Sequence, residues 1–334
     1  VDDMFQNFRA GNASFFCNMA DENHRHACLL GKAKQHCCSL LDLSNNKITE
    51  VSAFGPEINL VQLHLNNNRI ESLSRGENGE AFCGMADVET FSVRNNKIRQ
   101  FPDIFDANSI YGIASIDFSY NDIEGFENVD NGTYQGVYVQ TLSLANNPKL
   151  GKYPKCLAET KSKVDYIILR GCGIDEIPAG SFTGENSAYL MSLDLSYNHL
   201  TDIPREFHAG NMPYFYGIDL SYNRFSAFPF EPFDCASLTM MAIRGQRDEK
   251  GERCLKEWPT GVYNHTGLRA LYMGSNDLGK IDDTISYLIY YLDISDNPNI
   301  VFDASDICYN WMNGTYFLLY DKTQDIRNCA AMLE

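Results

Sequence analysis

Acidic residues recur along this chain at a spacing that could bring their carboxylates together. Asp194 and Asp219 are 25 residues apart, and each is followed two positions later by a serine. If the chain between them forms one coil of a repeat, the two carboxylates lie side by side, where such a pair can exchange protons or bind Ca²⁺. Asp-x-Ser is also a common polar sequence at the solvent-facing positions of a strand. We therefore predict a surface role for both aspartates, without a catalytic residue or a metal site.

Tyrosines and arginines stand close to these aspartates and are better suited to binding. Tyr197 and Tyr222 each follow one of the aspartates by three positions. Both residue types are enriched in binding hot spots because they combine a large contact area with polar groups. The alternative is that they are scattered surface aromatic residues. The predicted binding residues are Asp194, Tyr197, Asp219, Tyr222, Tyr120, Arg170 and Arg244.

Metal-ligating side chains are concentrated near the start of the chain, at His24, His26, Cys28, His36, Cys37 and Cys38. They lack the repeated Cys-x-x-Cys or His-x₃₋₅-His frame that structural zinc sites usually show. We therefore predict neither a metal nor a cofactor.

Eleven cysteines are many for a reduced cytosolic protein and favour an oxidising, extracellular compartment. Cys308 and Cys329 are predicted to pair. Cys235 and Cys254 flank a charged insertion that a disulfide could tether. Two further candidates, without an assigned pairing, are Cys17 and Cys28.

The acidic balance limits the class of partner. With 27 Lys and Arg against 44 Asp and Glu, the formal net charge is −17. Nucleic acids and anionic membranes attract basic surfaces, so neither is an expected partner. No apolar run reaches the roughly 18–20 residues of a membrane helix. The chain begins at Val1 without a basic and apolar leader, so we expect any export signal to have been removed or never present.

A short pattern repeats through most of the chain. Its clearest copies are LDLSNNKI (Leu41–Ile48), LDLSYNHL (Leu193–Leu200) and IDLSYNRF (Ile218–Phe225). Eleven copies carry an Asn or a substitute, from Asn46 to Asn297, about 25 residues apart. The Leu-x-Leu alternation predicts a strand with one buried face, and parallel stacking of the copies would bury these columns as one core.

The Asn column has its own physical reason. Where the chain turns out of a strand, buried backbone groups lack ladder partners, and an inward amide can satisfy both donors and acceptors. Cys172 takes this place in one copy.

Several copies continue into Pro followed by Phe, as at Ile177-Pro178 with Phe182 and at Ile203-Pro204 with Phe207. With these motifs, residues 38–303 resemble the leucine-rich repeat family, and the Ile-Pro-x-x-Phe phrasing resembles its extracellular-type repeats. The aromatic-rich copies of irregular length are also similar to surface repeat proteins of gut Bacteroidetes. The resemblance implies an α/β fold: a right-handed, horseshoe-shaped solenoid of about eleven repeats. A parallel β-sheet would line its concave face, and short helical or irregular segments its convex face.

The predicted organisation is an N-terminal cap with cysteines (1–37), the repeats (38–303) and a C-terminal cap (304–334). One repeat carries a surplus charged stretch, and insertions in solenoids project as rim loops that often contact ligands. The alternative is a neutral, solvated excursion. The rim-loop candidates are Arg247, Asp248, Glu249 and Lys250.

These features favour a secreted or cell-surface, non-enzymatic binding module that is a monomer. Its expected partner is a protein with a neutral or basic surface, recognised by the concave face and rim loops. A glycan-binding protein and a structural, self-associating surface element are the alternatives.

Overall fold

The computed structural model describes residues 14–16, 40–51, 61–73, 88–102, 112–126, 138–159, 163–204, 207, 212–229, 237–258, 267–281, 289–302 and 317–321. The chain divides into two compact units, Val1–Cys172 and Gly173–Glu334, which are called unit 1 and unit 2 and are described separately.

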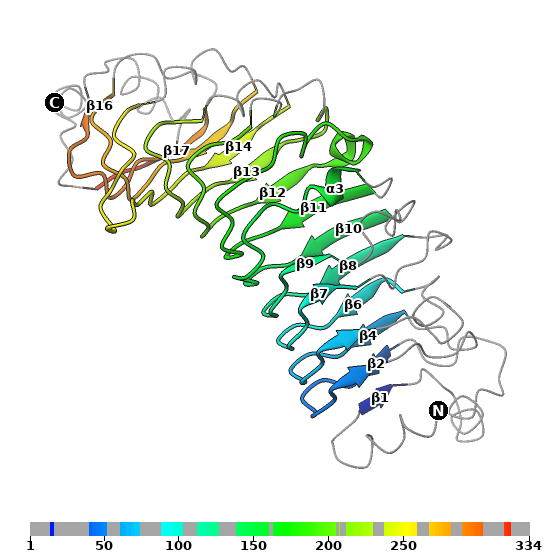
Figure 1. Ribbon diagram of the computed structural model, residues 1–334. Helices are drawn as coiled ribbons and strands as arrows, with labels where there is room; N and C mark the ends of the chain where they lie inside the picture. Colours follow the sequence, from blue (N-terminus) through cyan, green and yellow to red (C-terminus); the bar gives the residue numbers. More distant parts are fainter. Residues whose placement is uncertain are drawn as a thin grey trace, which may run out of the picture. The chain divides into compact units, whose positions relative to one another are not determined.

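In unit 1, successive repeats place their strands side by side (Figure 1). Neighbouring strands run parallel, except that β1 pairs antiparallel with β2. The sheet consists of β1 (Ser14–Phe16), β2 (Leu40–Asp42), β4 (Gln62–His64), β6 (Thr90–Ser92), β8 (Ile113–Asp117), β10 (Tyr138–Ser143) and β11 (Lys163–Ile168). Short second strands also pair, namely β3 (Glu50–Val51) with β5 (Ser72–Leu73) and β7 (Gln100–Phe101) with β9 (Gly125–Phe126). The helix α3 is Cys156–Glu159.

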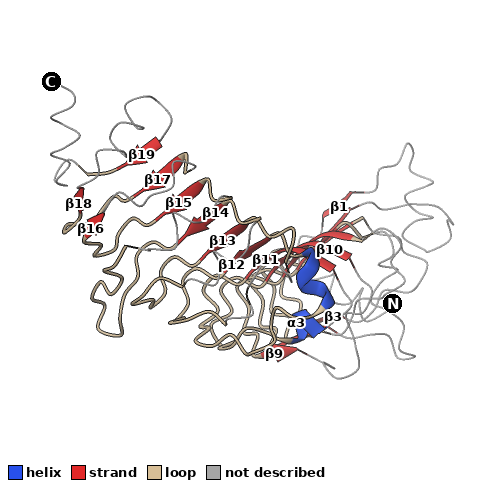
Figure 2. Cartoon of the chain, turned by 90° about the horizontal axis from the view of Figure 1, so that it is seen from above, coloured by secondary structure: helices blue, strands red, loops and turns tan. Residues whose placement is uncertain are grey.

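Unit 2 has the same arrangement, with its strands in one layer above the connecting loops (Figure 2). All neighbouring pairs in its sheet are parallel. The strands are β12 (Ser192–Asp194), β13 (Gly217–Asp219), β14 (Met240–Ala242), β15 (Ala270–Tyr272), β17 (Tyr291–Asp293) and β19 (Phe317–Leu319). A second pair joins β16 (Lys280–Ile281) to β18 (Val301–Phe302), and η3 is a 3₁₀ turn at Glu185–Tyr189.

These elements confirm the predicted parallel-sheet solenoid with little helix. A strand lies at each of the eleven predicted positions, but the regular coils number about seven, fewer than expected. The spacing between successive column residues varies from 21 to 30, so the return segments cannot all form identical coils. The strand β19 lies in the predicted C-terminal cap and extends the sheet of unit 2 by one strand. The cap boundaries themselves remain predictions.

The core of each unit is built from the repeat columns. The two leucines of the Leu-x-Leu pattern point inward, as at Leu193 and Leu195, both fully buried. Phenylalanines fill the space beneath the strands. Phe182, Phe207 and Phe215 pack edge to face, with ring centroids 4.7 and 5.1 Å apart. Such contacts stabilise the core beyond their buried area.

The Asn column forms the predicted hydrogen bonds. Asn223 Nδ2 donates to the carbonyls of Leu195 (2.9 Å) and Leu220 (3.0 Å), and its Oδ1 accepts from the backbone N–H of Leu200 (3.0 Å). Each such amide therefore joins its own strand exit to that of the preceding repeat. The same bonds recur in both units at Asn68, Asn96, Asn121, Asn147 and Asn297. Asn276 differs in one donor, because its Oδ1 accepts from the N–H of the preceding column residue, Gln246.

Cys172 can replace Asn because its position requires a hydrogen-bond donor but no acceptor. Its thiol donates to the Leu144 carbonyl, at 3.1 Å between sulfur and oxygen. In the preceding repeat, Asn147-Pro148-Lys149-Leu150 forms a tight turn, so the Leu150 N–H bonds to the Asn147 carbonyl instead of needing an amide oxygen. A side chain that only donates is sufficient at this position.

We predict that Asn223→Ala lowers the free energy of unfolding by about 3 kcal/mol. The change leaves the buried Leu200 N–H without a partner, which costs about 1–3 kcal/mol. It also removes one of two side-chain donors from the Leu195 and Leu220 carbonyls, which keep Asn198 Nδ2 and Gln246 Nε2 respectively. Urea denaturation measures the loss. As a control, Asn299→Ala removes an exposed bond to Asp277 and should change stability by less than about 0.5 kcal/mol. A similar small loss for both variants would contradict the role of the column.

Candidate binding face of the second unit

The residue just before the Asn column adopts a left-handed backbone in both units, with φ of 58° at both Tyr197 and Tyr222. This region suits Gly and Asn and is uncommon for bulky residues. The fixed turn after each strand imposes it, because the column amide bonds to carbonyls on either side of the turn. The left-handed residues of the repeats are Asn45, Asn67, Asn95, Tyr120, Asn146, Gly171, Tyr197, Tyr222, Gly245, Ser275 and Asp296.

Tyr197 and Tyr222 stack on each other. Their ring centroids are 4.3 Å apart and their planes differ by 26°. Both side chains are substantially exposed, at 44% and 41%. A Cβ on Gly245, the next residue in this column, would lie 2.6 Å from Tyr222 Cε1, so Gly245 leaves the space that the ring occupies.

The predicted neighbours Asp194 and Asp219 lie directly opposite each other on β12 and β13. Each carboxylate also stabilises its own turn. Asp194 Oδ1 accepts from the Ser196 N–H (2.8 Å) and hydroxyl (2.6 Å), and Asp219 Oδ1 accepts from the Ser221 N–H (2.8 Å). Burial raises the pKa of Asp219, and the adjacent charge of Asp194 acts in the same direction. The pair therefore forms a concentrated negative site held on ordered backbone.

Arg244 is fixed by a buried carboxylate two strands away. Its Nε and Nη2 donate to Asp293 Oδ2 at 2.8 and 2.6 Å, and its guanidinium carbon lies 4.6 Å from the centroid of the Tyr272 ring. Asp293 is only 3% exposed, and its Oδ1 accepts from the Ser295 N–H and hydroxyl. Gly274 gives this pair room, since a Cβ there would lie 3.1 Å from Asp293 Oδ1.

Aromatic side chains continue along the remaining strands. Tyr272 and Tyr291 have ring centroids 5.2 Å apart, and Tyr291 and Phe317 have centroids 6.0 Å apart. Phe317 is 72% exposed, and Leu319 on the same strand is 44% exposed. Phe317 is not among the predicted binding residues, because its segment was expected to form a cap. The outward side chains of β12, β13, β14, β15, β17 and β19, with the turn after each strand, are called the unit 2 face.

Two predicted binding residues belong to unit 1. Tyr120 is 46% exposed and carries the guanidinium of Arg94 over its ring, 4.3 Å from the centroid. Arg170 is exposed in the turn after β11. The other five predicted binding residues, Asp194, Tyr197, Asp219, Tyr222 and Arg244, lie together on the unit 2 face.

The charged insertion is an ordered turn whose tip is exposed to solvent. Arg247 and Arg253 pair across its base as an antiparallel bridge. Asp248 Oδ1 accepts from the N–H groups of Lys250 (2.9 Å) and Glu252 (2.8 Å), which closes the turn. The Asp248 side chain therefore makes its hydrogen bonds within the turn itself.

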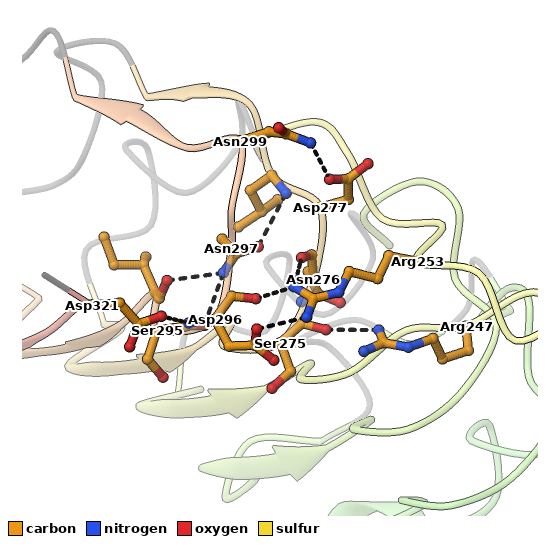
Figure 3. Close-up of polar contacts among 12 residues, drawn as sticks. Arg247, Arg253, Ser275, Asn276, Asp277, Ser295, Asp296, Asn297, Asn299 and Asp321 are labelled. Carbon is orange, nitrogen blue, oxygen red and sulfur yellow. Dashed lines mark hydrogen bonds and ion pairs between the residues drawn. The ribbon is translucent and has the colours of Figure 1, made fainter. Parts of the chain in front are cut away.

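The two arginines of this turn attach it to the following repeats (Figure 3). Arg247 Nη1 donates to the Ser275 carbonyl at 2.7 Å. Arg253 Nη1 donates to the carbonyls of Asn276 and Asp296, and its Nη2 lies 2.6 Å from Asp296 Oδ1. The hydrogen bond from Arg253 holds the pKa of Asp296 below its ordinary value.

These contacts divide the rim-loop candidates. Arg247 and Asp248 are occupied by structural bonds within the chain. Glu249 and Lys250 are exposed at the tip, where Glu249 pairs with Arg224 at 3.1 Å. Only the tip is therefore available to a partner.

The disulfide predicted between Cys235 and Cys254 is wrong for Cys254, which has a free thiol in the structure. Its sulfur donates to the Phe225 carbonyl at 3.2 Å, and this bond anchors the segment without a crosslink. The other candidates lie outside the described residues, namely Cys17, Cys28, Cys235, Cys308 and Cys329.

Within the described ranges, no group of three or more His, Cys, Asp or Glu side chains could hold a metal ion. The histidine and cysteine cluster near the chain start lies outside these ranges. The same part of the chain contains no helix with the length and apolar character needed to cross a membrane.

We predict that Gly245→Ala disrupts the tyrosine stack, because the new methyl would overlap the Tyr222 ring. The loss of unfolding free energy should be about 2–3 kcal/mol, the sum of this overlap and the left-handed backbone cost, with a changed near-UV circular dichroism signal. Gly251→Ala is the matched control: Gly251 also has a left-handed φ, of 83°, but has no heavy atom within 4 Å of the new Cβ. It should lose only the backbone contribution of about 1 kcal/mol. Equal losses would show that the stack imposes no constraint on Gly245.

We predict that Arg253→Met lowers the free energy of unfolding by about 1–2 kcal/mol, because the carbonyls of Asn276 and Asp296 lose their donor. Glu249→Gln, which weakens the exposed pair at the tip, should change it by less than about 0.5 kcal/mol. Thermal and urea unfolding of both variants measure the difference. If Arg253→Met is as mild as Glu249→Gln, the turn is not attached as described.

Comparisons with known proteins agree with this architecture. A Leucine Rich Repeat family profile matches residues 189–209. Human lumican is 28% identical over 166 residues, and bovine lumican is 26% identical over 167 residues. Each match covers 49% of this chain, but only 38% of the human and 44% of the bovine protein.

Two solved structures match over most of this chain. A leucine-rich repeat protein from Bacteroides eggerthii has a TM-score of 0.79 and 38% identity, over 92% of this chain and 51% of that one. A second, from Bacteroides thetaiotaomicron, has a TM-score of 0.75 and 36% identity, over 86% of this chain and 35% of that one. This chain therefore spans about half the length, or less, of these solved relatives. With its repeat columns, its stacked parallel strands and these likenesses, the chain belongs to the leucine-rich repeat proteins.

Proposed function

We propose that this protein is a non-enzymatic binding module that recognises another protein through the unit 2 face. The observation that carries the proposal is the exposed stack of Tyr197 and Tyr222 beside Asp194 and Asp219. Aromatic rings on a fixed backbone supply contact area at a low entropic cost, as binding hot spots require. Its leucine-rich repeat fold supports the proposal, since this fold commonly mediates protein binding.

The geometry favours a protein partner over a glycan. Sugar recognition uses open ring faces, whereas one face of each tyrosine in the stack is covered by the other ring. The exposed edges and hydroxyl groups suit the mixed apolar and polar contacts of a protein interface.

We further propose that the protein works outside the cell or at its surface, as its eleven cysteines suggest. Residues 173–334 hold 23 Asp and Glu against 11 Lys and Arg, a formal net charge of −12, which favours a neutral or basic partner. Affinity should therefore fall as salt is raised.

We predict that the double change Tyr197→Asn and Tyr222→Asn weakens partner binding about 30-fold or more, because it removes two hot-spot side chains. Asn already occupies this left-handed position at Asn67 and Asn95, so the fold is retained. The partner is first captured with the intact chain from its native extracellular fluid and identified, and its affinity is then measured by biolayer interferometry.

Tyr214→Asn provides the control, because Tyr214 is 60% exposed but lies outside the unit 2 face. Affinity unchanged by the double substitution would exclude the tyrosine stack as the binding site. Light scattering on the same samples separates partner binding from self-association.

A further inference from the structure

Along the order of its strands, the side chains of the unit 2 face change from acidic to apolar. At β12 and β13, the outward residues opposite each other are Asp194 and Asp219. At the other end, the exposed side chains of β19 are Phe317 and Leu319. An acidic end and an apolar end therefore share one continuous sheet.

The acidic end is only partly neutralised within the chain. Arg244 follows β14 on this face, but its Nε and Nη2 bind the buried Asp293. Its charge acts to lower the pKa of Asp219 by less than burial raises it. The carboxylates of Asp194 and Asp219 remain adjacent to each other, and burial and mutual repulsion raise the pKa of Asp219. A cationic side chain from a partner would relieve that repulsion, and the neighbouring tyrosine rings could also contact it.

At the apolar end, the exposed side chains form a connected surface. Phe317 is 72% and Leu319 is 44% exposed, and Phe317 continues the aromatic row from Tyr272 and Tyr291. Between the two ends, β14 and β15 present Met240 opposite Ala270 and Ala242 opposite Tyr272. Met240 is 36% exposed, so a chain lying across these strands would contact its apolar side chain and the Tyr272 ring.

The distance between the acidic end and the apolar end sets the length of a chain that could contact both. From β13 to β19 there are four strand steps, through β14, β15 and β17. At about 4.8 Å a step they cover about 19 Å, which an extended chain spans in about six residues.

We propose that the unit 2 face binds an extended segment of a partner protein that crosses the strands. A Lys or Arg of that segment lies against Asp194 and Asp219, and an aromatic or aliphatic residue about six positions away packs on Phe317 and Leu319. This inference rests on the proposed function and adds the chemistry, spacing and orientation of the bound segment. The net charge of −12 of residues 173–334 is complementary to such a segment.

The test uses a phage-displayed library of random 12-residue peptides, selected on the intact chain and depleted on the Tyr197→Asn, Tyr222→Asn variant. Enriched peptides should carry Lys or Arg about six residues from an aromatic residue, Leu or Met. Double-mutant cycles with one such peptide then locate its ends. Asp219→Asn, which retains an acceptor for the Ser221 N–H, should weaken binding about tenfold, and that loss should disappear when the peptide's basic residue is Ala.

Phe317→Ser should show the same coupling with the apolar peptide residue and none with the basic one. Two matched controls should change binding less than about twofold: Asp117→Asn, which keeps the equivalent turn in unit 1, and Val301→Ser on β18. Face-dependent peptides without this spacing, or coupling between the opposite ends, would overturn the inference and leave the proposed function standing. Absence of any peptide that depends on the tyrosine stack would contradict both.

Discussion

The structure depends on one interaction, the hydrogen bonding of a buried side-chain amide at the exit of each strand. A parallel strand as short as three residues leaves backbone groups unpaired where the chain turns away. The amide of Asn223 satisfies two carbonyls and one N–H from two successive repeats. The column thus connects neighbouring strand exits and fixes the turn between strand and return segment. Cys172 shows the limit of this requirement, because a local turn in the preceding repeat already satisfies the N–H that the amide oxygen would otherwise serve.

The fixed turn also determines what the surface presents. It holds the residue before the amide in a left-handed conformation, where Asn, Gly, Ser, Asp and Tyr occur in different repeats. Where two tyrosines fall in consecutive repeats they stack, and the glycine that follows leaves them space. The residue before the amide therefore only completes the turn in some repeats, and in others it is a candidate binding group. The charged turn at residues 247–253 reinforces this part of unit 2, since its arginines bond to the carbonyls of Ser275, Asn276 and Asp296.

The periodic features could be predicted from the sequence, because they depend on position within one repeat. These features include the strand positions, the inward amides and the adjacency of Asp194 with Asp219 and of Tyr197 with Tyr222. Contacts between unlike repeats could not be predicted. The pairing of Arg244 with Asp293 joins residues 49 positions apart, and it depends on a glycine between them and on the burial of that aspartate. The free thiol of Cys254 was missed for a similar reason, since spacing alone does not show that a backbone carbonyl lies within reach.

Native-state hydrogen exchange at the amides of Ile98, Ile123 and Leu200 tests this account most directly. These N–H groups lie outside the strands, and each donates to the Oδ1 of a buried Asn at 3.0–3.1 Å. The account predicts that they are protected as strongly as amides inside the sheet. The Lys250 N–H, which donates to a carboxylate in an exposed turn, should exchange far faster. Exchange of the three amides at the rate of Lys250 would contradict the claim that the amide column holds the strand exits in place.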